Sequence, residues 1–564
     1  MATGAGRLVG STQAVALNPF DISDELVDDI LALSPMTKTS LGVPGADDRW
    51  DDTSPTGKQA LVAVLRSHRE ALAAHLEHSD PDQRHAATVL VGWLDSRIAE
   101  YDSGDYLIDL NHVYCGFTKI RDIFDIMARG SQSVWSDITA RLASLEEPLG
   151  GWRRVLEAGV AAGQTAARRQ VESVIEQADN LAGEDSMFAG LLDEARAGGF
   201  SDEALEEAVI RARKEAARTA EWLRVHYLPH ARAEDGVGEE RYIRSAERFL
   251  GMKVDTDETY GWAWGEIARL QAEMVEVAGL IDADVSVDAV IELLETDPAR
   301  AVGIDEFTAF VQARLDQAVL DLDGVHFDVP APIRPIEVKL APPGGALGAW
   351  YINPSVDWER PGSVWYSLGH KDTVPVWQEV STAYHEGFPG HHLQVGTSMY
   401  QADHLSRAHR LLVWYSGYGE GWALYTERLM DDLGYFDKPE YRMGMLASQL
   451  FRAVRVVVDI GCHLGYPIPG HAPLHPGQPW DFDRAVDYID MIGLQPRDVA
   501  VSEVKRYLGW PGQAISYKVG EREIVDMRWS LERRDPGFDL KDFHRRILEG
   551  GELRLDYLRT RMLA

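Results

Sequence analysis

The stretch Tyr384–Gln394, which reads YHEGFPGHHLQ, constrains the chain most, because four potential metal ligands fall within eight residues around a Pro-Gly pair. Neutral imidazole and carboxylate are ligands that zinc prefers in proteins. In many zinc hydrolases a His-Glu pair opens the site, where the His binds the metal and the Glu takes the proton of the metal-bound water. The stretch therefore predicts zinc bound by His385, with Glu386 as the general base.

The second ligand of this stretch does not stand at the usual spacing. Position 389, four residues after His385, is a proline, which cannot bind metal. Six residues of α-helix rise about 9 Å and turn about 600°, which places His391 roughly 120° away from the face of His385. A kink at the Pro-Gly pair would swing His391 back toward that face. His392 would share the face of His385 without a kink, but about 10.5 Å along the axis. Geometry favours His391 and leaves His392 as the alternative.

Three further motifs follow this stretch: EGWALYTE at Glu420–Glu427, DIGCH at Asp459–His463 and PGQAISY at Pro511–Tyr517. Together with the His-Glu stretch they resemble the bacterial domain-of-unknown-function 885 family, which is grouped with the gluzincin-type zinc metallopeptidases. The resemblance covers roughly residues 335–530. In the family pattern the first His after the Pro-Gly pair is the recurrent one, which favours His391 over His392.

A catalytic zinc needs three protein ligands and one open position. Glu420 is the candidate third ligand, 34 residues after Glu386. Glu427 lies seven residues further on nearly the same helical face, so it is a candidate to orient a ligand histidine from outside the metal's own shell.

Attack on an amide also builds an oxyanion, which a neutral donor stabilises. Tyr517 is the first candidate, and Gln513, four residues earlier, would share its helical face. His463 is the second candidate donor. Arg455 could bind a substrate carboxylate bidentately or form a structural pair with Asp459. We expect His463, Gln513 and Arg455 to contact the substrate.

The composition limits the classes of partner that the protein is expected to bind. The 564 residues carry a net charge of −34, which argues against nucleic acid and anionic membrane surfaces, since both attract basic proteins. Two cysteines form no disulfide framework or cysteine zinc site. Residues 1–18 lack the pattern of a secretory signal, and no apolar run reaches the ~20 residues that span a bilayer. We expect a cytoplasmic protein.

The apolar spacing predicts a mainly α fold, a large metallopeptidase-like helical body with a deep cleft and a small β-sheet beside the active-site helix. Helices are expected at 239–250, 256–281 and 304–322, with a break of the helical pattern at Gly150–Gly151. Prolines between 330 and 343 end the helical pattern, and alternation predicts strands at 336–340 and 349–353. We expect an N-terminal helical region, 1–330, and a zinc-site region, 331–564, as one continuous unit with two lobes.

The two strands would form a hairpin whose edge can bind an extended peptide, with Tyr351 as a candidate substrate contact. The helical pattern after them includes expected helices at 513–533 and 540–560. The sequence thus predicts a zinc-dependent peptidase acting on short peptides. A zinc hydrolase of a small non-peptide amide or ester is the alternative, and a non-catalytic metal-binding protein is a third. Glu386 argues against the third, because a purely structural site needs no base.

Overall fold

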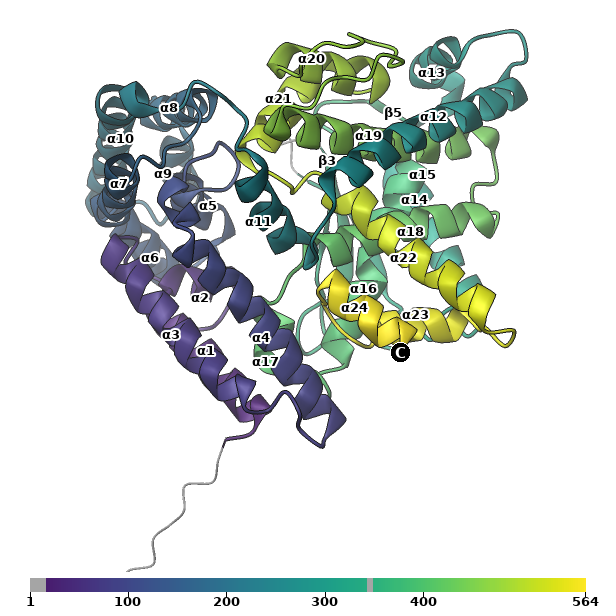
Figure 1. Cartoon of the computed structure of the whole chain (residues 1–564). Coiled ribbons are helices and arrows are strands. Elements are labelled where there is room, and N and C mark those ends of the chain that lie inside the picture. The colour runs from purple at the N-terminus through teal and green to yellow at the C-terminus, as the bar shows by residue number, and fades with distance from the viewer. Residues whose placement is uncertain (1–16, 342–347) are drawn as a thin grey trace, which may run out of the picture.

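The computed structural model describes residues 17–341 and 348–564, and this part of the chain is mostly helical, with two small sheets (Figure 1). The expectation of a mainly α fold is confirmed. Among the described residues, no helix has both the length and the apolar character needed to cross a bilayer.

Helices joined by short loops make up the first half. They are α1 (Pro19–Leu33), α2 (Pro35–Ser40), α3 (Pro55–Ala73), α4 (Pro81–Asp102), η1 (Asp105–Ile108), α5 (Gly116–Ile126), α6 (Gln132–Ala143), α7 (Glu146–Ala161), α8 (Arg168–Ala182), α9 (Met187–Gly198), α10 (Glu203–Trp222), η2 (Leu223–Tyr227), η3 (Leu228–His230), α11 (Glu239–Leu250), α12 (Thr256–Ile281), α13 (Val287–Thr296), η4 (Pro298–Arg300) and α14 (Ile304–Leu322). The residues beside several helix N-termini explain why those helices begin there. Asn18, Ser54 and Asp80 accept hydrogen bonds from first-turn amides of helices that begin with proline.

The expected break at Gly150–Gly151 was wrong, because α7 runs through both residues. A Cβ atom on Gly151 would lie 2.2 Å from Thr53 Oγ1 and 2.9 Å from the Ser54 amide nitrogen. This glycine is therefore needed for the close approach of the loop before α3, and it does not end a helix.

The main sheet has three strands, β2 (Ile336–Leu340), β3 (Gly348–Ile352) and β4 (Gly362–Ser367), in the order β2-β4-β3. The two predicted strands are present, but the expected hairpin is wrong. β4 lies between them, parallel to β2 and antiparallel to β3. A smaller pair joins β1 (Ala301–Gly303) to β5 (Thr373–Pro375). β3 is thus an edge strand of the main sheet.

The helices after the sheet build the rest of the body. They are α15 (Glu379–Glu386), α16 (His391–Tyr400), α17 (Arg407–Leu412), α18 (Ser416–Asp432), α19 (Pro439–Leu464), α20 (Phe482–Asp487), η5 (Tyr488–Ile492), α21 (Arg497–Gly509), α22 (Ser516–Arg534), α23 (Leu540–Leu548) and α24 (Leu555–Leu563). The expected helix 540–560 is interrupted after Leu548, where Gly551 has a positive φ of 69°. This interruption places Glu552 in a loop.

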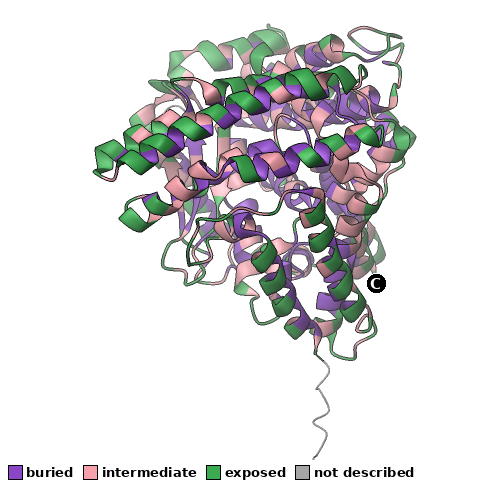
Figure 2. Cartoon of the chain, turned by 90° about the vertical axis from the view of Figure 1, so that its left-hand side faces the viewer, coloured by how far each residue is buried: buried purple, intermediate pink, exposed green. Residues whose placement is uncertain are grey.

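In the part of the chain that the structure describes, buried apolar side chains form two hydrophobic cores. One is formed by residues between 36 and 227. The other combines α1, α3 and α4 with residues from Tyr242 to Met562. The cores group the helices differently from the expected regions 1–330 and 331–564, because α12 packs on α19 and α14 packs on α15 across that boundary. On the side of the molecule formed by the N-terminal helices, the long helices bury one face and expose the other (Figure 2).

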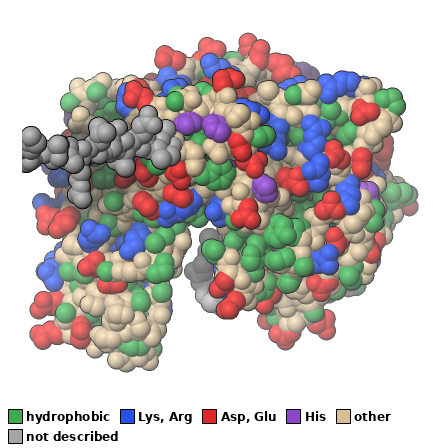
Figure 3. Space-filling model, turned by 90° about the horizontal axis from the view of Figure 1, so that it is seen from below, with side chains coloured by type: hydrophobic (Ala, Val, Ile, Leu, Met, Phe, Trp, Pro, Cys, Tyr) green, Lys and Arg blue, Asp and Glu red, His purple; other side chains and the backbone are tan. Residues whose placement is uncertain are grey.

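Acidic and basic side chains alternate over the surface seen from below, which is hollowed between its left and right parts (Figure 3). On this face, the charged residues do not form a broad patch of one sign.

Helices α18 and α22 lie side by side (Figure 1) and cross at glycines. A Cβ atom on Gly520 would lie 2.0 Å from the carbonyl oxygen of Gly417, and one on Gly421 would lie 2.5 Å from the carbonyl carbon of Gly520. Only glycine permits this separation. Because Glu420 precedes Gly421, the crossing also sets the position of a predicted ligand.

We expect Gly520→Ala to lower the free energy of unfolding by about 3 kcal/mol, because the added methyl group meets backbone atoms that have no room to move. The control is Gly265→Ala in α12, where a Cβ atom meets nothing within 4 Å. That change should stabilise the helix by about 0.5–1 kcal/mol. Chemical denaturation measures both, and equal effects would contradict the close crossing.

Candidate metal centre

The Pro-Gly pair separates two helices. α15 ends at Glu386 and α16 begins at His391. Between them the Gly390 amide donates to the carbonyl of Tyr384 at 3.0 Å. A Cβ atom on Gly390 would lie 1.9 Å from the His385 carbonyl oxygen, so the reversal requires glycine. Trp422 of α18 fixes the turn by donating from Nε1 to the Pro389 carbonyl at 3.0 Å. The interruption expected from the sequence thus takes the form of a break between two helices.

This break brings two imidazoles to one carboxylate. Glu420 Oε2 lies 3.4 Å from Nε2 of His385 and 3.5 Å from Nε2 of His391. One potential ligand atom from each residue lies within 4.8 Å of the other two. Two tetrahedral zinc ligands with bonds of about 2.1 Å lie roughly 3.4 Å apart. The two distances from Glu420 therefore match those between tetrahedral zinc ligands, and a site with these three ligands would leave a fourth position for water.

The far side of each imidazole has an acceptor. His385 Nδ1 lies 2.7 Å from Glu427 Oε1, and His391 Nδ1 lies 3.2 Å from Gln394 Oε1. Glu427 is itself held by Ser381, whose Oγ donates to Oε2 at 2.6 Å. Such acceptors place the proton on Nδ1 and leave the Nε2 lone pair for a metal. Glu420 and Glu427, on one face of α18, thus hold opposite sides of the His385 ring.

The electrostatics of the site favour a cation. Burial works to lower the pKa of His385, but its hydrogen bonds to Glu420 and Glu427 outweigh burial and raise the pKa to about 10. Burial works to raise the pKa of Glu420, and its hydrogen bonds to His385 and His391 hold it far below the ordinary value. The carboxylates therefore stabilise positive charge between the imidazoles, which a metal ion would supply in place of protons.

His392, the alternative ligand, is directed elsewhere. Its Nε2 lies 2.5 Å from the carbonyl oxygen of Ile333, and its Nδ1 lies 3.1 Å from the Tyr351 hydroxyl. Burial lowers its pKa to about 4, so the ring is neutral. Since the Ile333 carbonyl can only accept, Nε2 donates to it and Nδ1 accepts from Tyr351. His392 holds Tyr351 and does not face Glu420.

A cavity of about 520 Å³ lies beside the three potential ligands. Its lining includes Glu386 and four residues from three other elements. These are Tyr351 from β3, Arg452 and Arg455 from α19, and Tyr517 from α22.

Glu386 and Tyr517 are the polar groups that chemistry at the cavity would use. Burial raises the pKa of Glu386, while His391 and His385 oppose that shift. Burial and then the charge of Glu420 raise the pKa of Tyr517, so its hydroxyl keeps its proton. The guanidinium carbons of Arg455 and Arg452 lie 4.8 and 5.8 Å from the centre of the Tyr517 ring.

Two expected substrate contacts lie away from this cavity. His463 is buried with Nε2 at 3.1 Å from the Tyr507 carbonyl, and it is not among the lining residues. Gln513 is also absent from the lining, and its Oε1 accepts from Arg506 at 2.8 Å. The expected shared helical face was wrong, because α22 begins only at Ser516 after a turn in which Gly512 has a φ of 75°.

Arg455 lines the cavity, but its expected pairing with Asp459 is not formed. Its Nη2 lies 2.9 Å from Glu503, and its Nε donates to the Tyr507 hydroxyl at 2.9 Å. Asp459 instead accepts from the Tyr242 hydroxyl and the Gly512 amide. The guanidinium of Arg455 is therefore largely committed to the protein.

Three residues at this site were not predicted from the sequence. Gln394 orients His391 and donates from Nε2 to Glu552, whose pKa burial raises well above the ordinary value. Arg452 lines the cavity one helical turn before Arg455. The spacing of the two arginines was a usable signal. The pairing of Gln394 with Glu552 joins distant segments and left no local pattern.

Comparison with known proteins gives a family and a fold. The model of a family described as "Bacterial protein of unknown function (DUF885)" matches residues 35–562. A crystal structure described as a "putative lipoprotein" from Colwellia psychrerythraea shares 22% identity and a TM-score of 0.81, over 97% of this chain and 99% of that one. A similarly described protein of unknown function from Shewanella oneidensis shares 20% identity and a TM-score of 0.76, over 97% and 100%. No curated protein matches the chain.

We expect His391→Ala to weaken zinc binding by more than ~100-fold, because it removes a ligand, whereas changes of outer partners typically cost 10–100-fold. His392→Ala is the matched neighbour and should keep its zinc affinity, since that ring bonds to Ile333 and Tyr351. Competition against a chromophoric chelator measures both affinities. Loss of zinc from the His392 variant alone would show that the two residues are wrongly assigned.

We expect Glu427→Gln to weaken zinc binding by ~10–100-fold without abolishing it, because the carboxylate that orients His385 is lost while all three ligands remain. The same chelator competition measures this change. Unchanged affinity would contradict the role given to Glu427.

Proposed function

Because the chain belongs to the DUF885 family of bacterial proteins, whose function is unknown, we propose its function from the site: a zinc-dependent hydrolase that cleaves amide bonds of short peptides. The gluzincin-like character suggested by the sequence motifs is part of this proposal.

The observation that carries the proposal is the convergence of His385, His391 and Glu420 beside Glu386 on the wall of a cavity. A structural zinc site uses four protein ligands and closes the metal off, whereas a catalytic site uses three and keeps one position open. A zinc ion held there would lower the pKa of a water molecule and polarise a substrate carbonyl.

Glu386 is the general base in this proposal. It adjoins His385 in the chain and shares the cavity wall with His385 and His391. Its carboxylate would accept the proton of the attacking water and pass it to the leaving amine. Burial raises the pKa of Glu386 above its ordinary value, which makes its carboxylate a stronger proton acceptor.

Tyr517 is the donor to the oxyanion. Its hydroxyl stays protonated because burial and the charge of Glu420 raise its pKa. The Arg452 and Arg455 guanidinium groups beside its ring favour negative charge nearby. A protonated phenol that faces a developing negative charge stabilises the transition state more than the substrate.

The edge strand β3 favours a peptide over a compact metabolite. Ala349, Trp350 and Tyr351 of this strand line the cavity. Within the described residues, β3 pairs with β4 alone, so its other edge can accept main-chain hydrogen bonds from an extended peptide. His392 holds the Tyr351 side chain at this edge.

We expect Glu386→Gln to keep zinc and to lose about 10²–10⁴-fold of its turnover, because glutamine preserves shape but accepts no proton. Glu420→Gln should lose the metal first and the activity with it. Elemental analysis and hydrolysis of a defined mixture of short peptides are measured on both. The matched control is Glu207→Gln, an exposed residue of α10, which should change neither.

Loss of zinc from the Glu386 variant would contradict the roles given to these two glutamates. Full activity with zinc retained would exclude Glu386 as the base. If the unmodified zinc protein cleaves small amides or esters but no peptide, the alternative substrate class replaces the peptide class.

A further inference from the structure

The proposed catalytic cavity contains an arginine with no ion-pair partner. Arg452 lines the cavity, and within the described residues no carboxylate lies within 4.0 Å of its guanidinium nitrogens. Residues 1–16 and 342–347 contain no Asp or Glu that could supply one. Its Nη1 donates to Ser448 Oγ at 2.8 Å, and its Nε is buried with no hydrogen-bond partner in the described structure.

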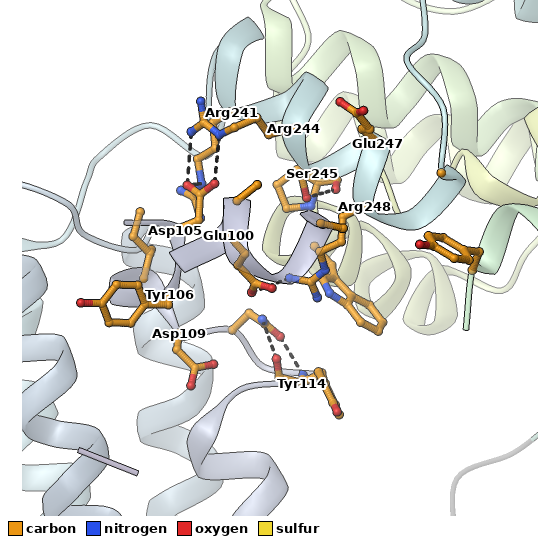
Figure 4. A pocket seen from close by; sticks show the side chains of 18 of the residues that line it. Glu100, Asp105, Tyr106, Asp109, Tyr114, Arg241, Arg244, Ser245, Glu247 and Arg248 are labelled. Carbon is orange, nitrogen blue, oxygen red and sulfur yellow. Dashed lines mark hydrogen bonds and ion pairs between the residues drawn. The ribbon is translucent and has the colours of Figure 1, made fainter. Parts of the chain in front are cut away.

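The arginines of a second cavity are, by contrast, paired with carboxylates. That cavity, of about 370 Å³, lies beside α4 and α11 (Figure 4). There Arg241 and Arg244 lie 3.4 and 3.2 Å from Asp105, and Arg248 lies 2.6 Å from Glu100. Those cations are already paired within the protein.

The acidic residues around Arg452 form their close contacts with other groups. The carboxylate of Glu503 on α21 pairs with Arg455 at 2.9 Å and with Arg506 at 3.0 Å. Glu552 also lines the cavity, but it forms no ion pair with Arg452, and burial raises its pKa well above the ordinary value, which disfavours its charged form. Glu386 shares the wall with Arg452 but forms no ion pair with it. A guanidinium that forms no ion pair with the described residues therefore lines the space that a substrate would fill.

We propose that Arg452 binds a carboxylate of the substrate, so that the protein acts on peptides that carry a carboxylate beside the cleaved bond. This inference rests on the proposed peptidase function. A guanidinium presents paired N–H donors that match the two oxygens of a carboxylate, and leaving it unpaired in a partly buried cavity is unfavourable. Arg455, fixed by Glu503 and Tyr507, keeps Tyr517 beside Arg452.

The carboxylate comes from the C-terminus of a short peptide or from an acidic side chain. Both sources present the same planar anion, and two pairs of test peptides distinguish a C-terminal carboxylate from an acidic side chain. One pair of tripeptides has a free C-terminus or a C-terminal amide. A second pair is amidated and carries Glu or Gln at the residue next to the cleaved bond.

The first experiment compares these substrates with the unmodified zinc protein and with Arg452→Met. We expect the unmodified protein to cleave one carboxylate-bearing member at least 10- to 100-fold more efficiently, in kcat/KM, than its uncharged twin, which is the scale of a hydrogen bond to a charged group. Arg452→Met should remove that preference, so that both members of the pair are cleaved with equal kcat/KM, and it should slow both because the Arg452 charge also lies beside Tyr517. Arg452→Lys should keep part of the preference, because lysine retains the positive charge but lacks the paired N–H donors of a guanidinium. Arg211→Met, exposed on α10, should keep the full preference.

The second experiment measures binding without turnover. Calorimetric titration of the same peptides into zinc-loaded Glu386→Gln should give tighter binding of the carboxylate member, and the double variant with Arg452→Met should lose it. Equal binding of both members, or a preference that survives in Arg452→Met, overturns the inference. If the peptides bind in a carboxylate-dependent way but the unmodified protein does not hydrolyse them, the role of Arg452 is supported and the peptidase proposal is rejected. If the peptides are hydrolysed with no preference for a carboxylate, the peptidase proposal is supported and the role of Arg452 is rejected.

Discussion

The structure of the site depends on one carboxylate, Glu420, that faces two imidazoles from two different helices. The distances of 3.4 and 3.5 Å from its oxygen require His385 and His391 to meet, although no straight helix would bring them together. Gly390 permits the reversal between α15 and α16, and Trp422 fixes it. The close crossing of α18 and α22 at Gly421 holds Glu420 at the third corner.

Elements with local signals could be predicted from the sequence. The bounds of α11, α12 and α14 match those expected, because apolar spacing and end residues encode them. β4 was missed, and the pairing of β2 with β3 was wrong, since strand order depends on contacts between distant segments. Gly151 was misread for the same reason. It makes room for the loop at Thr53, and that contact leaves no trace near residue 151.

The residues of the candidate site also differ in whether local sequence could predict their roles. The residues placed at the potential metal centre stand in short motifs, and their spacing together with the family resemblance indicated His385, His391 and Glu420. His463 and Gln513 stand in equally clear motifs but serve packing and a turn. Whether an arginine is free for a ligand depends on which acids fold against it. Glu503 forms an ion pair with Arg455, whereas Arg452 forms none within the described residues, and the spacing of the arginines alone could not separate the two.

The most direct test of the account is an anomalous difference map, recorded on both sides of the zinc absorption edge, from crystals grown with zinc. The account predicts one strong peak about 2.0–2.2 Å from Nε2 of His385, Nε2 of His391 and Oε2 of Glu420. The peak should leave an open position toward the cavity that Glu386 and Arg452 line. A peak at His392, or none between the three side chains when zinc is supplied, would contradict it.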